Sequence, residues 1–407
     1  MQSIHGFSTE KPAARSGSLR PTTSLLTVRY GRNSRATRHY ATIAAGFGSY
    51  NIEKEPISPP HGCSAYIHPE GQLYFACATT PPVVTEAYLY SDKNQEAIVY
   101  WIEQFNKLLD ARRIILPKTV ELFLQLSDES DDCLYYLVDY ATHVAFWIED
   151  EIATEDLWFP EVASKTHLRI HLTEQYWAHV EYFSAHRCSE LSMSNLHVDE
   201  LATVFLHGRA DRLTSATSTF PYDAAQCSDF LEVLNSARTC AVNAHTVTTI
   251  ARLWVIITHY RFNNLYGDLN ARLSSDQSVL ELPVLSRSRL FSIASQLLFK
   301  IPDAYEAELE SLWVDELVHQ EAWRAAAKSR RLEWALCSSW AFALLIVNLM
   351  LLMLPSISRP LAFASILMCN ISVVSSAVLL QRNRAAPGYV ADQAVRYLTH
   401  GFRSRTD

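Results

Sequence analysis

The sequence predicts a mainly α chain with a cytosolic helical domain, small β-hairpin pieces and a C-terminal two-helix transmembrane hairpin. Two uncharged apolar runs, from Trp334 to Leu354 and from Leu361 to Leu380, predict the transmembrane hairpin. Apolar residues at helical spacing predict a helical domain over residues 151–331. Turn residues between β-prone runs predict the hairpin pieces before residue 150.

The transmembrane hairpin is expected over residues 332–381. Each run is long enough to cross a hydrocarbon core of roughly 30 Å at about 1.5 Å per helical residue. The link at residues 355–360 contains two prolines and is too short to hold a domain. Lys and Arg collect outside the hairpin, at positions 324, 328, 330, 331, 382 and 384, so both termini are expected in the cytosol. A buried core hairpin of a soluble domain is the alternative.

Residues 1–57 are expected to form a disordered basic tail, because they are rich in Ser, Thr, Arg and Pro and poor in apolar periodicity. Arginines at positions 29, 32, 35 and 38 recur every third residue. They leave open a mitochondrial transit segment, with a cleavage-like site at residues 38–41. With the transmembrane hairpin, the chain is expected to be an integral membrane protein of the endoplasmic reticulum or another endomembrane. The transit-like segment makes the mitochondrial membrane the alternative.

The β pieces are predicted from turn chemistry. The turn from His68 to Gly71 lies between β-prone runs in the segment 58–91, and Gly favours the positive φ of such a turn. A helix is expected over residues 92–115. In the segment 116–150, alternating apolar residues flank an acidic turn at residues 127–132, which is typical of two strands and a loop.

The segment YYLVDYATH, followed by Trp147, resembles the second half of a WW domain. Tyr136 and Trp147 keep the spacing of the two aromatic residues that line the proline-binding groove of that family. The resemblance implies that Tyr136, Trp147 and His143 contact a proline-rich peptide. The segment 58–91 resembles a degenerate copy, with Cys63 at the position of the first Trp. The alternative is that these aromatic residues pack against the helical body.

A longer resemblance covers roughly residues 60–380. The order of HPEGQ, YYLVDYA, LTSATSTFPY, WVDELVH and a terminal apolar pair is similar to a fungal family of WW-domain-containing membrane proteins of unknown function. The family implies an architecture and no established activity.

Within residues 151–331, Ser164 is expected to cap a helix, Asp223 to start a long helical region, and residues 246–262 to form a buried core helix. Helical spacing from Asp303 onward predicts one continuous helix that enters the first span. Residues 382–407 are expected to form a cytosolic tail, either with a surface helix over 391–402 or frayed.

Composition excludes several classes of function. A net charge of −8 argues against nucleic acid as a partner, since its binding surfaces are basic. The eight cysteines lack the CxxC spacing and indicate a reducing compartment without a disulfide framework. None of GxSxG, GxxxxGK[ST] or GxGxxG occurs, so the sequence predicts no cofactor and no catalytic residue.

These observations favour a membrane-anchored interaction or scaffold protein whose partners are membrane lipid and proline-rich segments. One alternative is a membrane-bound enzyme with a metal site built from His167, His171 and His179. The i, i+4 spacing of the first two residues suits a metal, although the Glu of HExxH is absent. The other alternative is a hairpin that shapes the membrane.

Overall fold

The computed structural model describes residues 17–27, 29, 35–47, 49, 59–60, 62–127, 130–188, 195–280, 289–315, 317–318, 320–354 and 358–386. The chain divides into two compact units. The N-terminal unit comprises Met1–Thr214 and Tyr222–Leu269, and the C-terminal unit comprises Ser215–Pro221 and Asn270–Asp407. The described residues form nine α-helices beside short strands, which confirms the mainly α class. The helical domain expected over 151–331 is divided between the two units.

A seven-stranded sheet organises the N-terminal unit. Its strand order is β1-β6-β5-β4-β3-β2, and β7 also pairs with β6. The strands are β1 (Leu19–Pro21), β2 (Cys63–Ile67), β3 (Leu73–Cys77), β4 (Val83–Thr85), β5 (Val120–Leu126), β6 (Cys133–Asp139) and β7 (Val144–Phe146). Strands β2 to β4 form one antiparallel meander and β5 to β7 another. Helix α1 (Asp92–Arg112) connects the two meanders, which join through parallel pairing of β4 with β5.

The local turn predictions are confirmed. Gly71 has a φ of +95°, and the His68 amide donates to the Gln72 carbonyl to close the β2–β3 hairpin. Strands β5 and β6 lie on either side of the predicted turn at residues 127–132, of which residues 128 and 129 are outside the described part of the chain. The pairing of β4 with β5 follows from no local pattern, and it makes the segments 58–91 and 116–150 parts of a single sheet.

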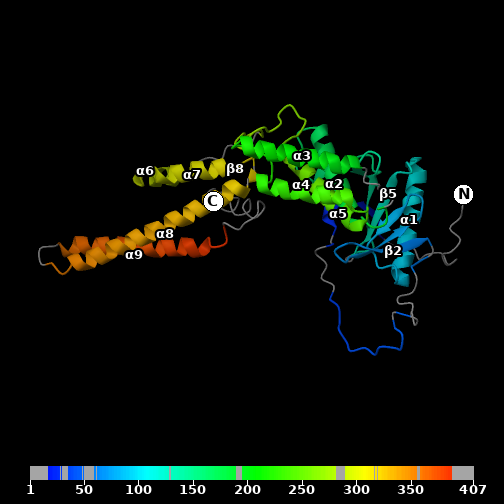
Figure 1. Ribbon diagram of the computed structural model, residues 1–407, viewed down its shortest axis with the longest axis horizontal. Coiled ribbons are helices and arrows are strands. Elements are labelled where there is room, and N and C mark those ends of the chain that lie inside the picture. The colour runs from blue at the N-terminus through cyan, green and yellow to red at the C-terminus, as the bar shows by residue number, and fades with distance from the viewer. Residues whose placement is uncertain are drawn as a thin grey trace. The chain divides into compact units, whose positions relative to one another are not determined.

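Helices cover both faces of this sheet (Figure 1). Side chains alternate between the faces along a strand. On β5, Leu122 and Leu124 join the core beneath α1, whereas Phe123 packs on Phe183 at the end of α2 (Lys165–Tyr182). Because both faces are covered, five of the seven residues of β5 and six of the seven residues of β6 are buried.

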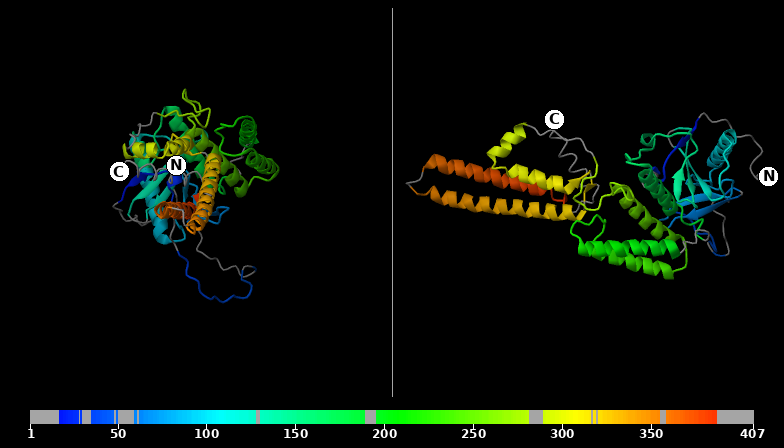
Figure 2. Two further views of the ribbon diagram at one scale, coloured as in Figure 1. Left: turned by 90° about the vertical axis from the view of Figure 1, so that its left-hand side faces the viewer. Right: turned by 90° about the horizontal axis from the view of Figure 1, so that it is seen from above.

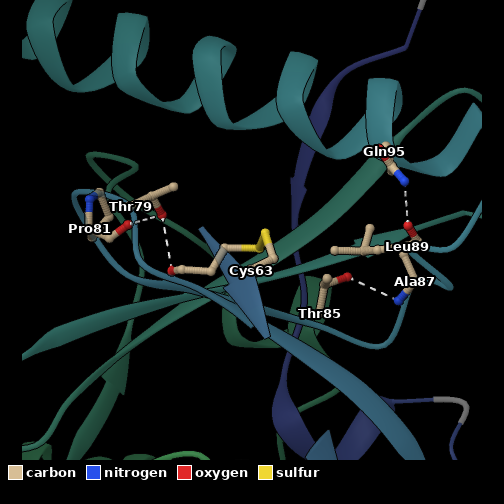
Figure 3. Close-up of a disulfide and its surroundings, with 8 residues drawn as sticks. Cys63, Thr79, Pro81, Thr85, Ala87, Leu89 and Gln95 are labelled. Atoms are coloured by element: carbon tan, nitrogen blue, oxygen red, sulfur yellow. Dashed lines mark hydrogen bonds between the residues drawn. A yellow bond between two sulfur atoms is a disulfide. The ribbon is translucent and has the colours of Figure 1, made fainter. Parts of the chain in front are cut away.

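A disulfide between Cys63 and Cys77 joins β2 to β3 on the α1 side of the sheet (Figure 3). The two residues are directly opposite, with Cα atoms 3.9 Å apart. The neighbouring bond from the Ala78 amide to the Gly62 carbonyl makes Cys63 and Cys77 a non-hydrogen-bonded pair, in which side chains approach most closely. The expectation that the cysteines form no disulfide is therefore wrong for this pair.

An N-terminal strap, defined as residues 17–27 and 29, is part of the folded unit. Strand β1 pairs in parallel with β6, and the buried Ser24 hydroxyl donates to the Gln175 carbonyl on α2 at 2.6 Å. The buried Arg29 guanidinium pairs with Glu86 at 2.8 Å. The expectation of a disordered tail over residues 1–57 is therefore wrong for the strap.

The strap also bears on the transit-segment alternative. Cleavage at residues 38–41 would separate β1 and Arg29 from the sheet. It would remove the Arg29 guanidinium from the buried Glu86 carboxylate, and breaking a buried ion pair is costly. The arginine repeat thus contains at least one residue with a structural role.

Four helices complete the N-terminal unit: α2, α3 (Asn195–Thr214), α4 (Ala224–Thr239) and α5 (Ala244–Asn263). The Ser164 side chain accepts from the His167 amide, so the predicted cap of α2 is confirmed. Asp223 caps α4 with a capping box to Gln226. Helix α5 packs on α2 and buries Val247, Ile250 and Trp254, as expected for a core helix.

The C-terminal unit contains α6 (Arg289–Leu297), α7 (Ile301–Leu312), the small hairpin β8 (Trp313–Val314) and β9 (Leu317–Val318), α8 (Gln320–Leu351) and α9 (Arg359–Arg382). The prediction of one continuous helix from Asp303 is wrong at β8 and β9. There Asp315 has a φ of +51°, and its carboxylate accepts from Arg272, Ser278 and the Val279 amide. From Gln320 onward the helix is continuous.

Helices α8 and α9 lie side by side in an antiparallel pair (Figures 1 and 2). Between them the Asn348 side chain donates to the Ser365 hydroxyl at 2.9 Å. Of the expected tail at residues 382–407, only residues 382–386 are described. The expected helix at 391–402 lies outside the described residues.

Candidate functional site

Tyr136, expected to line a peptide groove, is buried between the sheet and α2. Its exposed fraction is 0 %, its ring stacks on Phe123 at 4.6 Å, and its hydroxyl lies 3.0 Å from Nδ1 of His179. In this structure Tyr136 therefore packs against the helical body, which is the second of the two roles considered for it.

Trp147 lies near the surface beside Phe159, with ring centroids 6.0 Å apart. Its indole Nε1 donates to the carbonyl of Thr22 at 2.9 Å. Thr22 directly follows Pro21 in the strap. The hydrogen-bond donor of Trp147 is thus engaged by an extended, proline-containing segment of the same chain.

His143 belongs to a different aromatic cluster. It has a φ of 55° in the turn after β6, and its ring lies 5.1 Å from Tyr176, 5.8 Å from Trp177 and 5.2 Å from His197. Burial, followed by the neighbouring His197, lowers the pKa of His143. The contacts of His143 are therefore with α2 and α3, whereas those of Trp147 are with the strap.

A buried carboxylate, Glu121 on β5, lies at the centre of the polar interior. It is 1 % exposed. One oxygen receives hydrogen bonds from Tyr140 at 2.8 Å and from Nε2 of His179 at 2.9 Å. The other oxygen is 2.9 Å from Nε2 of His186 and 3.8 Å from the guanidinium of Arg187. A phenol hydroxyl, two imidazoles and a guanidinium thus surround one carboxylate.

The protonation states in this network follow from burial and contacts. Burial raises the pKa of Glu121, but the contacts with His186 and His179 lower it by more than burial raises it. The pKa therefore lies below the ordinary Glu value, and the carboxylate is ionised. Burial lowers the pKa of His179 more than Glu121 raises it, so the imidazole is neutral. The hydrogen bonds are satisfied when His179 donates from Nε2 to Glu121 and accepts the Tyr136 hydroxyl at Nδ1. We name this set, Glu121, Tyr136, Tyr140, His179 and His186, the Glu121 network.

The other histidines considered as metal ligands have separate partners. His167 bonds the Phe262 carbonyl through Nε2 at 2.9 Å, and His171 bonds Glu174 at 3.1 Å. No group of three or more His, Cys, Asp or Glu residues suited to a metal ion occurs among the residues that the structure describes. The geometry of these residues gives the metal-enzyme alternative no support.

Sequence reasoning did not single out Trp158, which is the most exposed tryptophan on the N-terminal unit at 83 %. It follows the short helical turn Thr154–Leu157 in a left-handed conformation, with a φ of 56°. Phe159, next in the chain, contacts Trp147. The surrounding segment 149–161 contains six acidic residues and no Lys or Arg. A bulky residue in a left-handed conformation inside an acidic loop could have been noted only once the fold was known.

The predicted spans are the clearest functional feature of the C-terminal unit. Two helices, Ala322–Leu351 and Arg359–Arg382, are long and apolar enough to cross a membrane, and only 6 % and 11 % of their most apolar windows are buried. Trp334 lies in α8, Leu354 lies just after it, and Leu361 and Leu380 lie in α9. This exposure is unlike that of core helices in a soluble protein.

Comparison with known proteins adds no further information about the site. No family model, curated protein or solved structure matches this chain. The resemblance to fungal WW-domain-containing membrane proteins accordingly stays a prediction.

Proposed function

We propose that this chain is a membrane-anchored interaction protein. The observation that supports the proposal is the exposure of α8 and α9: uncharged apolar side chains, including Leu344, Val347 and Leu361, face outward along both helices. Such surfaces are stable in hydrocarbon and costly in water. The hairpin anchors the chain, and the N-terminal unit holds partners near the bilayer.

Alkaline carbonate extraction of membranes tests the anchoring. The full-length chain is expected in the pellet. The double substitution Leu344→Arg and Val347→Arg is expected to move it to the supernatant, because each charge at mid-span costs about 2.5–3.5 kcal/mol. Leu206→Arg, at an exposed position of α3, is the control and should remain in the pellet. Wild-type protein in the supernatant would contradict the anchoring.

The proposed topology has both termini in the cytosol and residues 355–360 across the membrane, in an endomembrane or, alternatively, a mitochondrial membrane. The cationic flanks of the hairpin support it. Protease protection of chains tagged at each terminus tests it, and both tags should be digested in intact organelles. The Cys63–Cys77 disulfide provides a second readout, since in the cytosol this pair would be reduced to free thiols. An oxidised pair in intact cells, together with protected tags, would reverse the topology.

For the partner, we propose a proline-rich segment with basic residues, bound by the WW-like second meander at Trp147 and the adjoining Trp158. Exposed aromatic residues give proline-rich segments a surface on which to stack. The acidic segment 149–161 favours a basic ligand. The Trp147 indole N–H donates to the Thr22 carbonyl of the strap. A ligand would therefore displace this part of the strap or bind on the Trp158 side.

An array of proline-rich peptides with arginine flanks, probed with the full-length chain in detergent, tests this proposal. Trp158→Ala and Trp147→Ala are each expected to weaken binding by about thirtyfold, which corresponds to roughly 2 kcal/mol for a hot-spot residue. Ile115→Ala, at a residue that is 95 % exposed elsewhere on the unit, should leave binding unchanged. Equal binding by wild type and both tryptophan variants would refute the proposed surface.

A further inference from the structure

The turn between α6 and α7 presents apolar side chains to the surroundings of the C-terminal unit. Five large apolar residues within nine positions are exposed there: Ile293, Leu297, Leu298, Phe299 and Ile301. Phe299, the most exposed of them, has an exposed fraction of 90 %. Single exposed apolar residues are ordinary on protein surfaces, but a contiguous group marks an interaction site.

The backbone of this turn is held in a conformation that projects the group outward. Phe299 and Lys300 have φ values of 54° and 60°, an uncommon conformation for side chains of this size. The Lys300 amide donates to the Ser295 carbonyl at 2.8 Å, and the Ile301 amide donates to the Leu298 carbonyl at 3.1 Å. These hydrogen bonds hold the backbone of the turn, so the exposed apolar residues keep a fixed position relative to the start of α7.

The contacts of α7 with α8 fix the level of the turn along the first span. The Tyr305 hydroxyl donates to Glu333 at 3.1 Å, and Arg330 pairs with Glu308 while its guanidinium lies 4.3 Å from the Tyr305 ring centroid. Tyr305 thus lies near Glu333 and Glu308 near Arg330, so α7 runs antiparallel to α8. Figures 1 and 2 show α7 beside the first turns of α8, with α6 further toward the span.

Because α7 is antiparallel to α8 and Tyr305 lies beside Glu333, the turn before Tyr305 lies level with residues of α8 that follow Glu333, the last charged residue before the span. Glu333 is followed by an uncharged run that begins at Trp334. Going back from Tyr305 to Ile301 moves about 6 Å along the helix axis in the direction of the span, at about 1.5 Å per residue. Interfacial helices bury their apolar face about 5–10 Å into the boundary between headgroups and acyl chains. The turn therefore reaches this boundary when α8 crosses the bilayer.

We propose that α6 and the α6–α7 turn insert into the headgroup boundary of the membrane that α8 and α9 cross. The inference rests on the proposed anchoring and adds a third, interfacial contact to it. Phe299, Leu298 and Ile301 enter the acyl layer. Lys300, exposed at the apex, extends its ammonium group back to the anionic headgroups.

Photolabelling in vesicles tests the proposal. The full-length chain is reconstituted into phosphatidylcholine and phosphatidylserine vesicles that contain a phospholipid with a diazirine near the headgroup end of its acyl chain. Labelled peptides are then identified by mass spectrometry. Label is expected on the peptide that contains Phe299, on α8 and on α9. The peptide that contains Ile115, which is equally exposed on the N-terminal unit, serves as the unlabelled reference.

Variants separate this proposal from the anchoring itself. Phe299→Glu is expected to reduce label on the turn to the level at Ile115 while the spans stay labelled, whereas Phe299→Leu should keep the label. Labelled spans with an unlabelled wild-type turn would mean that protein or water covers the turn, and would overturn this inference alone. Unlabelled spans would overturn the anchoring as well.

Discussion

Replacing Glu121 with Gln tests whether the Glu121 network stabilises the N-terminal unit. The carboxylate accepts hydrogen bonds on both oxygens, from His179 and Tyr140 on one and from His186 on the other. An amide retains one acceptor and presents N–H groups to the remaining donors. Hydrogen bonds to a charged group contribute about 1.5–3 kcal/mol each, and breaking a buried ion pair costs about 3–5 kcal/mol. We therefore expect Glu121→Gln to lower the free energy of unfolding by about 2–4 kcal/mol.

Hydrogen exchange measured by mass spectrometry on the detergent-solubilised chain provides the assay, because it reports the opening of β5 and β6 separately from the membrane helices. A loss of about 3 kcal/mol speeds the exchange of their protected amides by roughly a hundredfold. Glu103→Gln makes the same substitution at an exposed position of α1 and is the matched control. If both variants change the opening free energy by less than about 0.5 kcal/mol, as ordinary surface substitutions do, the stabilising role of the network is refuted.

Three further predictions concern the same unit. Cys77→Ser, which removes the disulfide that closes a segment with a sequence separation of 14, should cost about 3 kcal/mol in an oxidising buffer; Cys240→Ser is the exposed control, and equal melting points would contradict the prediction. Arg29→Met removes the guanidinium that pairs with the buried Glu86 and should cost about 3–5 kcal/mol, measured as faster exchange in β4. Stability should fall as the pH drops below the ordinary His value of 6.5, because neutral His179 resists a proton that the unfolded chain accepts. His179→Gln should reduce that slope by up to about 1.4 kcal/mol per pH unit, and an unchanged slope would contradict it.

Features encoded by neighbouring residues could be predicted from the sequence. The β2–β3 turn at Gly71, the cap at Ser164 and the uncharged runs of α8 and α9 each depend on fewer than about twenty-five consecutive residues. In each case the residues that indicate the feature are also the residues that form it. Contacts with distant parts of the chain were therefore not needed to predict it.

Features that join distant residues could not be predicted in this way. Glu121 occupies the polar position of an alternating strand, which normally faces water, and it is buried only because α2 covers that face. Its partners His179 and His186 lie 58 and 65 positions away. Likewise, helical spacing continues through Trp313 to Val318, but Asp315 binds Arg272, 43 positions earlier, and the helix is interrupted there.

The unbroken course of α8 has a mechanical consequence. Its first fourteen residues, from Gln320 to Glu333, precede the uncharged run and form a rigid arm of about 21 Å at about 1.5 Å per residue. If α8 crosses a bilayer as proposed, a change of about 20° in its tilt, within the spread of roughly 0–40° found for membrane-spanning helices, would move the far end of that arm by about 7 Å. Trp323, whose indole donates to the Ala386 carbonyl at 2.8 Å, lies on this lever. With α8 in a membrane, a change in its tilt would therefore displace Trp323 and the residues around it relative to the bilayer.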